Sequence, residues 1–117
     1  MKRILVVDDE PGIRRLYSEE LEDEGYAVRL ASNGEEARRI VDSEEIDLVI
    51  LDIRMEKEDG LAALSGIKKV RRDLPVILNS AYPTFKSDFK SWLADFYVVK
   101  SSDLDQLKEK INQLLKV

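Results

Sequence analysis

The chain of 117 residues contains no cysteine and no histidine, and these two absences narrow its chemistry. Without cysteine, neither a disulfide nor a thiolate metal site can form. Without histidine, the chain has no Ser-His catalytic pair, no histidine metal ligand and no histidine of its own to phosphorylate. Any chemistry must therefore be carried by carboxylates, hydroxyls or lysines.

Long apolar runs are also missing, and the charge balance is acidic. Only four aliphatic residues precede the first acids, which is too short for a signal peptide, and no run approaches the length of a membrane span. A formal net charge of −5 argues against nonspecific binding to nucleic acid or to an anionic membrane. We therefore expect a cytoplasmic protein whose residues 1–117 form one domain with a core of its own.

Apolar runs of strand length alternate with segments of helical periodicity along the whole chain. The expected strands are residues 2–8, 26–31, 46–53, 75–80 and 96–99. The expected helices are one from Pro11 to Gly25, one capped by Asn33 with Glu36, one opening at Asp59-Gly60, one carrying Phe85, Phe89, Trp92 and Leu93, and one capped by Ser102. Such alternation predicts a parallel sheet covered by helices on both faces, because its crossovers are right-handed.

Acidic residues follow the first and third expected strands. Asp8 and Asp9 come directly after the aliphatic residues 4–7, and Asp52 lies near the end of the apolar run 46–53. The carboxyl ends of parallel strands meet at one edge of the sheet, where open α/β sheets bind their ligands. Carboxylates crowded there repel one another unless a hard cation lies between them, and Mg²⁺ typically takes carboxylates together with waters and phosphate oxygens. The spacing therefore predicts a Mg²⁺ site.

A hydroxyl and an amine belong to the same edge of the sheet. Ser80 ends the fourth expected strand, and Lys100 follows the fifth. A lysine and a hydroxyl beside a metal ion are typical of a site that holds a phosphoryl group. Asp52 is then the natural acceptor, because an aspartate carboxylate can act as a nucleophile and form an acyl phosphate.

Together these residues strongly resemble the receiver domain of two-component response regulators, over essentially the whole chain. The family's motifs are matched, in chain order, by the acidic pair Asp8-Asp9, by Asp52 in LDIRM, by Asp59-Gly60, by Ser80 in NSA, and by Tyr97 and Lys100 in ADFYVVK. The resemblance implies a flavodoxin-like fold, a doubly wound five-stranded parallel sheet of (βα)5 type with strand order 2-1-3-4-5.

The resemblance also implies how the metal is held. Asp9 and Asp52 would bind Mg²⁺ directly, Asp8 would act through water, and the backbone carbonyl of Arg54 would complete the protein ligands. The phosphoryl donor would be a sensor histidine kinase or a histidine phosphotransfer protein on another chain. A homodimer formed on phosphorylation is a further option, and no direct binding to nucleic acid or membrane is expected.

Signalling would depend on the residues that meet the phosphoryl group. Lys100 and Ser80 would contact it, and the resemblance implies that phosphorylation draws Ser80 and Tyr97 inward as a switch. The conformational change would then control a partner or an output domain.

The chain departs from the family's pattern in three places. Glu56 and Ser101 stand where the family usually has proline, and the stretch from Ser80 to Lys100 is shorter than usual. The family's Lys-Pro bond is commonly cis, but a cis bond before a residue other than proline costs about 2.5–4 kcal/mol. We therefore expect the Lys100–Ser101 bond to be trans.

Two other functions fit part of the pattern. A phosphatase with an aspartate nucleophile typically needs a second aspartate two positions later as general acid, and position 54 is Arg. A phosphorylation-independent interaction module of the same fold would not need the acidic pocket, yet the acids, the hydroxyl and the lysine are all present. A phosphoacceptor that catalyses only its own phosphorylation and dephosphorylation fits best.

Overall fold

The computed structural model describes residues 1–55, 58–81, 94–101 and 103–115. Its centre is a five-stranded parallel sheet in the order β2-β1-β3-β6-β7. The strands are β1 (Arg3–Val7), β2 (Ala27–Ala31), β3 (Leu48–Asp52), β6 (Val76–Ser80) and β7 (Phe96–Val99). This confirms the expected order 2-1-3-4-5, with β6 and β7 as the fourth and fifth strands of the sheet.

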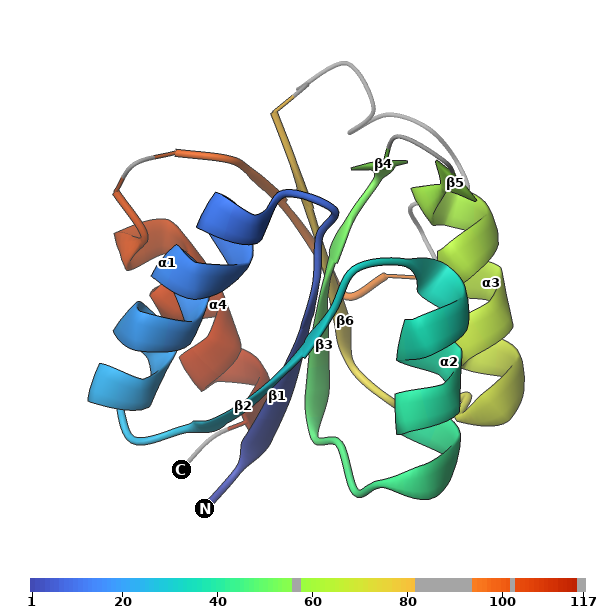
Figure 1. The fold of residues 1–117 in the computed structure, drawn as a ribbon. Helices are drawn as coiled ribbons and strands as arrows, with labels where there is room; N and C mark the ends of the chain where they lie inside the picture. The colour runs from blue at the N-terminus through green and yellow to red at the C-terminus, as the bar shows by residue number, and fades with distance from the viewer. Residues whose placement is uncertain (56–57, 82–93, 102, 116–117) are drawn as a thin grey trace.

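Helices cover both faces of the sheet (Figure 1). On one face, α1 (Pro11–Asp23) and α4 (Asp105–Leu115) enclose a core with Ile4, Val6, Leu48, Ile50 and Ile77. On the other, α2 (Gly34–Ser43) and α3 (Gly60–Val70) enclose a core with Leu5, Val7, Val49, Leu51 and Leu78. Neighbouring residues along each strand therefore belong to opposite cores, because successive side chains point to opposite faces.

The helix ends follow local chemistry that the sequence predicts. Pro11 occupies the first turn of α1, and Gly25 follows the helix with a φ of 94°, in the left-handed region that favours glycine. At α2, Asn33 Oδ1 accepts a hydrogen bond from the Glu36 N–H at 2.8 Å. The Glu36 carboxylate accepts in turn from the N–H of Ser32 at 3.0 Å, one residue before the cap.

The region after β3 differs from the charged loop that the sequence suggests. An antiparallel pair, β4 (Arg54–Met55) with β5 (Glu58–Asp59), precedes α3. Strands of two residues are too short to produce a recognisable alternation, so no sequence pattern could reveal them. Glu56 lies outside the described residues.

The C-terminal region confirms the fifth strand and the last helix but shifts where that helix begins. Helix α4 begins at Asp105, whose N–H donates to Asp103 Oδ1 at 2.9 Å. Ser102, the expected cap, lies outside the described residues, as does the expected helix with Phe85, Phe89, Trp92 and Leu93. Within the described ranges, no helix is long and apolar enough to cross a membrane.

Candidate functional site

The ends of four strands bring the predicted polar residues to one edge of the sheet (Figure 1). Asp8 directly follows β1 and is 2% exposed, and Asp52 is the last residue of β3 and is 4% exposed. Ser80 ends β6 and is fully buried, and Lys100 directly follows β7. Asp8 and Lys100, at opposite ends of the chain, therefore share one small region with Asp52 and Ser80.

Lys100 lies between the two buried carboxylates. Its Nζ is 2.8 Å from Asp8 Oδ2 and 3.3 Å from Asp52 Oδ2. Burial lowers the pKa of Lys100, but the hydrogen bond to Asp8 and the charges of Asp8 and Asp52 outweigh it, so the pKa is raised above its usual value. The amine is therefore a stable positive charge that compensates two acids removed from solvent.

Backbone and side-chain contacts connect Ser80 to both Lys100 and Tyr97. The Lys100 N–H donates to the Ser80 carbonyl at 2.6 Å, which ties the end of β7 to the end of β6. Burial raises the pKa of Tyr97, a hydrogen bond with the Ser80 side chain partly offsets this, and the charge of Asp52 adds to the rise. Tyr97 thus lies beside Ser80 and within the electrostatic range of Asp52.

The first acidic stretch offers a set of oxygen ligands. Asp8, Asp9 and Glu10 each place one carboxylate oxygen within 4.8 Å of those of the other two. The Glu10 N–H donates to Asp8 Oδ1 at 2.9 Å, which holds this turn in place. Arg54 begins β4 two positions after Asp52. An all-oxygen donor set of this kind suits a hard cation such as Mg²⁺.

Two residues support the site in ways that sequence reasoning did not foresee. Arg14, on the first turn of α1, donates from Nη1 to the Asp8 carbonyl at 2.7 Å. The Gly60 N–H donates to the Ile53 carbonyl at 2.7 Å, and a methyl group on Gly60 would overlap the backbone of Asp52 and Ile53. The sequence predicts a helix start at Asp59-Gly60, and a glycine at such a position also indicates a close approach of the backbone.

A third unforeseen contact lies next to Asp52. Asn79 Nδ2 donates to the Tyr17 hydroxyl at 2.6 Å, and both residues are 2% exposed. The sequence patterns assign no role to either residue. The signal available was an amide side chain near the end of the buried apolar strand β6.

The Lys100–Ser101 peptide bond is trans, as expected, since none of the peptide bonds between described residues is cis. The Ser101 hydroxyl accepts from the Asp103 N–H at 3.1 Å. This contact joins Ser101 to Asp103 just before α4, and position 101 is where the family usually has proline.

Fold and site together define a doubly wound α/β domain with a lysine-compensated carboxylate centre at the carboxyl edge of its sheet. The family model for the response regulator receiver domain matches residues 4–112. The chain therefore belongs to the response regulator receiver domain family, the phosphoacceptor signalling domains of two-component systems.

The chain is similar to known response regulators and covers different shares of their length. The chain is 34% identical over 116 residues to sporulation initiation phosphotransferase F of Bacillus subtilis, covering 97% of this chain and 94% of the relative. It is 42% identical over 79 residues to the transcriptional regulatory protein GlrR of Escherichia coli, covering 68% of this chain. It spans only 18% of GlrR, and 46% of the probable transcriptional regulator ycf27 of Cyanidium caldarium.

Solved structures of the response regulator TrrA from Thermotoga maritima are also similar. TrrA in complex with Mg²⁺–BeF is 54% identical with a TM-score of 0.93, covering 97% of this chain and 99% of that chain. TrrA in complex with the histidine kinase ThkA is 54% identical with a TM-score of 0.92, covering 98% of this chain and 99% of that chain.

Proposed function

We propose that residues 1–117 act as one receiver domain in which Asp52 accepts a phosphoryl group from a phosphohistidine on a sensor histidine kinase or a histidine phosphotransfer protein. The observation that carries this is the Lys100 amine, held 3.3 Å from the Asp52 carboxylate and 2.8 Å from that of Asp8. A fixed positive charge beside an acceptor stabilises the oxygens of an incoming phosphoryl group. The kinase complex and the Mg²⁺–BeF complex of TrrA support the same assignment.

The chemistry is a transfer between two nucleophiles. An Asp52 carboxylate oxygen attacks phosphorus, the donor's N–P bond breaks, and its electron pair stays on the imidazole nitrogen. Lys100 pairs with the phosphoryl oxygens, and the Ser80 hydroxyl donates a hydrogen bond to one of them. Water later hydrolyses the acyl phosphate and returns Asp52 to its free form, so the domain turns over only its own phosphoryl group and is not an enzyme for other substrates.

The acidic residues of the site fit Mg²⁺. Asp9 and Asp52 would bind it directly, Asp8 would act through water, and the backbone carbonyl of Arg54 would add a third direct protein ligand. The bound ion supplies positive charge that offsets the repulsion between carboxylates and phosphoryl oxygens. The support is that Asp8 and Asp9 each place a carboxylate oxygen within 4.8 Å of the other. Asp52 does not belong to that group, but Lys100 Nζ contacts both Asp8 and Asp52, which puts Asp52 beside it.

The hydrogen bond between Ser80 and Tyr97 supports a switch. When the Ser80 hydroxyl turns to a phosphoryl oxygen, its hydrogen bond with Tyr97 breaks, and the tyrosine side chain takes a new position. A conformational equilibrium biased in this way would control a partner or an output domain, with a homodimer formed on phosphorylation as one readout.

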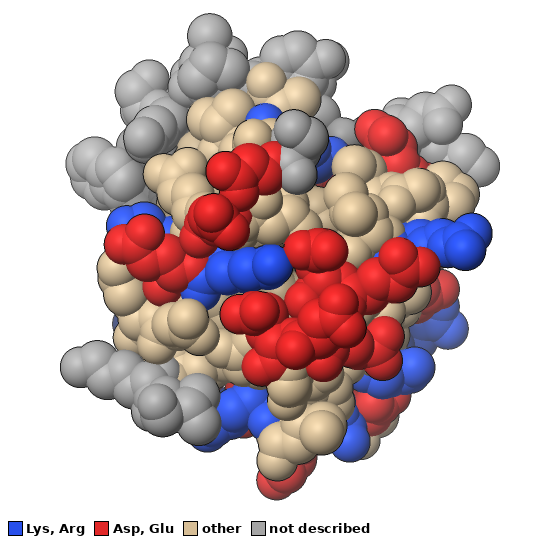
Figure 2. Space-filling model, turned by 90° about the vertical axis from the view of Figure 1, so that its left-hand side faces the viewer, with Lys and Arg blue, Asp and Glu red and all other residues tan. Residues whose placement is uncertain are grey.

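The surface favours a protein partner over a polyanion. Figure 2 shows acidic side chains gathered in a broad patch over α1, and the net charge of the chain is −5. Such a surface repels nucleic acid and anionic lipid. Because its donor is made by a kinase that consumes ATP, we place the domain in the cytoplasm.

The test is phosphorylation by acetyl phosphate in the presence of Mg²⁺, followed by intact mass. The wild-type chain should gain one phosphoryl group, and Asp52→Asn should gain none. Asp47→Asn is the matched control, because Asp47 precedes β3 and its carboxylate accepts from the Arg3 N–H at 2.7 Å, at the opposite edge of the sheet. A phosphoryl adduct that persists in Asp52→Asn would remove the basis of the proposal.

A further inference from the structure

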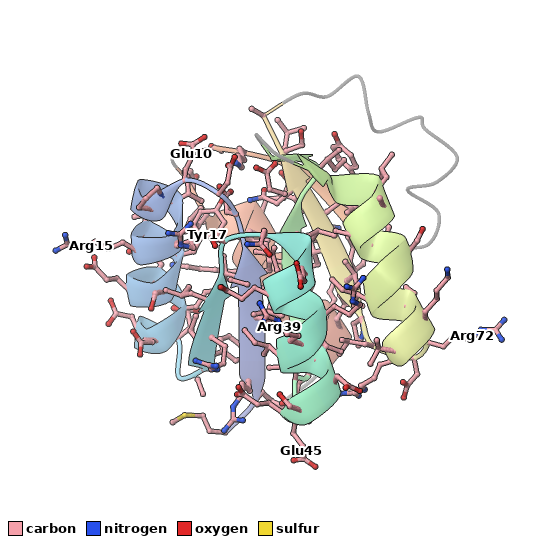
Figure 3. The ribbon with its side chains drawn as sticks, turned by 45° about the vertical axis from the view of Figure 1, so that its right-hand side comes forward. Glu10, Arg15, Tyr17, Arg39, Glu45 and Arg72 are labelled. Carbon is pink, nitrogen blue, oxygen red and sulfur yellow. The ribbon has the colours of Figure 1, made fainter. Side chains whose placement is uncertain are left out.

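A buried hydrogen bond joins α1 to β6 directly beside the acceptor strand. Asn79 Nδ2 donates to the Tyr17 hydroxyl at 2.6 Å across 62 positions of sequence. Figure 3 shows Tyr17 between α1 and the sheet. Both residues are 2% exposed, so solvent does not compete for this contact.

The register of the sheet puts Asn79 next to Asp52. The two residues are paired partners on the adjacent strands β6 and β3, and residues paired in this way project to the same face. Asn79 also immediately precedes Ser80. The pKa of Tyr17 is raised, mainly by burial and also by the charges of Asp8 and Asp52, while the hydrogen bond with Asn79 and the charge of Lys100 partly offset the rise. The phenol therefore lies within electrostatic range of all three charged groups.

Stability alone gives little reason for a polar pair here. The remaining buried side chains between this face of the sheet and α1 and α4 include many aliphatic ones, such as Ile50 and Ile77. Two apolar side chains of the same shape can replace a buried hydrogen-bonded pair with nearly no change in stability. What a hydrogen bond adds is direction, because it restricts where the two groups can lie relative to each other.

We propose that Tyr17 and Asn79 form a positioning pair that holds the end of β6 against α1 and so sets the spacing between Asp52 and Ser80 for phosphoryl transfer. The inference rests on the proposed function of Asp52 as acceptor. Helix α1 follows the acidic turn that contains Asp8, so one hydrogen bond links two of the segments that build the site, this turn and the end of β6. Small displacements of reacting groups slow a reaction steeply.

The experiment compares Tyr17→Phe, Asn79→Leu and the double variant with the wild-type chain. The rate of phosphorylation by acetyl phosphate is measured by intact mass at saturating Mg²⁺, and the free energy of unfolding by urea titration. Tyr26→Phe is the matched control, because Tyr26 donates to Asn112 Oδ1 at the same distance of 2.6 Å, just before β2 and thus at the opposite edge of the sheet.

We expect each single variant to lower the maximal rate about tenfold while the half-saturating acetyl phosphate concentration changes little, since a misplaced group affects the reaction more than binding. The double variant should regain stability relative to the less stable single variant, yet remain slow. Tyr26→Phe should lose stability and keep its rate.

Three outcomes would overturn the inference. The first is that both single variants are phosphorylated at the wild-type rate. The second is that the phosphorylation rate of the double variant recovers together with its stability, which would make the pair purely structural. The third is a wild-type chain that acquires no phosphoryl group on Asp52, which removes the proposed function itself and this inference with it. If Asn79→Leu does not fold, Tyr17→Phe alone decides, because it removes only the hydroxyl.

Discussion

Replacing Lys100 with methionine, which keeps the length of the side chain and removes its charge, tests the electrostatics of the site. The Asp8 and Asp52 side chains are only 3% and 5% exposed, and the lysine side chain 15%. Removing one partner of a buried ion pair costs about 3–5 kcal/mol, because the remaining charge is buried without compensation. Since Lys100 keeps some contact with solvent, we expect a loss near the lower end, about 3 kcal/mol.

Magnesium should reverse much of this loss. A ligand that binds only the folded state stabilises it by RT ln(1 + [L]/Kd), which is about 2.7 kcal/mol at a hundredfold excess over Kd. The variant should also bind Mg²⁺ more tightly than the wild-type chain, because no lysine competes for the carboxylates. Phosphorylation of the variant should nevertheless be slow, because its phosphoryl-pairing amine is gone.

The assay is urea unfolding followed by circular dichroism, with a chelator and then with excess Mg²⁺. Lys108→Met is the matched control, since it removes a lysine 2.9 Å from Glu20 on the surface, away from the acids of the site. Its stability should respond to Mg²⁺ as the wild-type chain does. A Lys100→Met variant as stable as the wild-type chain in chelator would show that the lysine does not compensate the acids.

The pH dependence of the stability difference between the wild-type chain and Lys100→Met follows from the raised pKa of Lys100. A group whose pKa is higher in the folded state contributes stability fully below its unfolded pKa and loses it as the pH rises through the folded pKa. The contribution of Lys100 should therefore stay constant from about pH 7 to about pH 9 and decline only above the ordinary lysine pKa of about 10.4. A decline centred near neutral pH would contradict this assignment.

Two further predictions concern neighbouring residues. Asp9→Asn should weaken Mg²⁺ binding, which is measured as a smaller rise of the melting temperature at millimolar Mg²⁺. In chelator its stability should stay equal or increase, because repulsion between carboxylates is relieved. A lower stability in chelator would mean that Asp9 has a structural role. Gly60→Ala should cost about 1–3 kcal/mol and slow phosphorylation of Asp52, because the new methyl group displaces the backbone beneath the acceptor. Gly12→Ala is its control. Apart from its own chain neighbours and the backbone of its own helix, no atom lies within 4 Å of the added methyl group there, so stability measured in urea should not fall. Equal losses in both variants would refute the steric argument.

Local patterns were enough to predict the five strands of the parallel sheet, the helices α1 to α4 and the acidic edge. A buried strand such as β3 is indicated by an apolar run in the sequence. The helix ends are indicated by Pro11, Asn33 and Gly25, through their own backbone and side-chain preferences. The topology rule for parallel sheets then brings Asp8 and Asp52 to the same edge without any knowledge of distances.

Only the tertiary structure decided which groups touch. The bond between Tyr17 and Asn79 and the position of Lys100 between two carboxylates join residues that are distant in the chain. The close approach of Gly60 to the backbone of Asp52 depends on how the start of α3 packs against the end of β3. Contacts of this kind depend on how helices pack against the sheet to within about an ångström, which periodicity does not encode. The amino-acid sequence by itself determines the components of the site and the edge at which they meet, and packing determines the distances on which its chemistry depends.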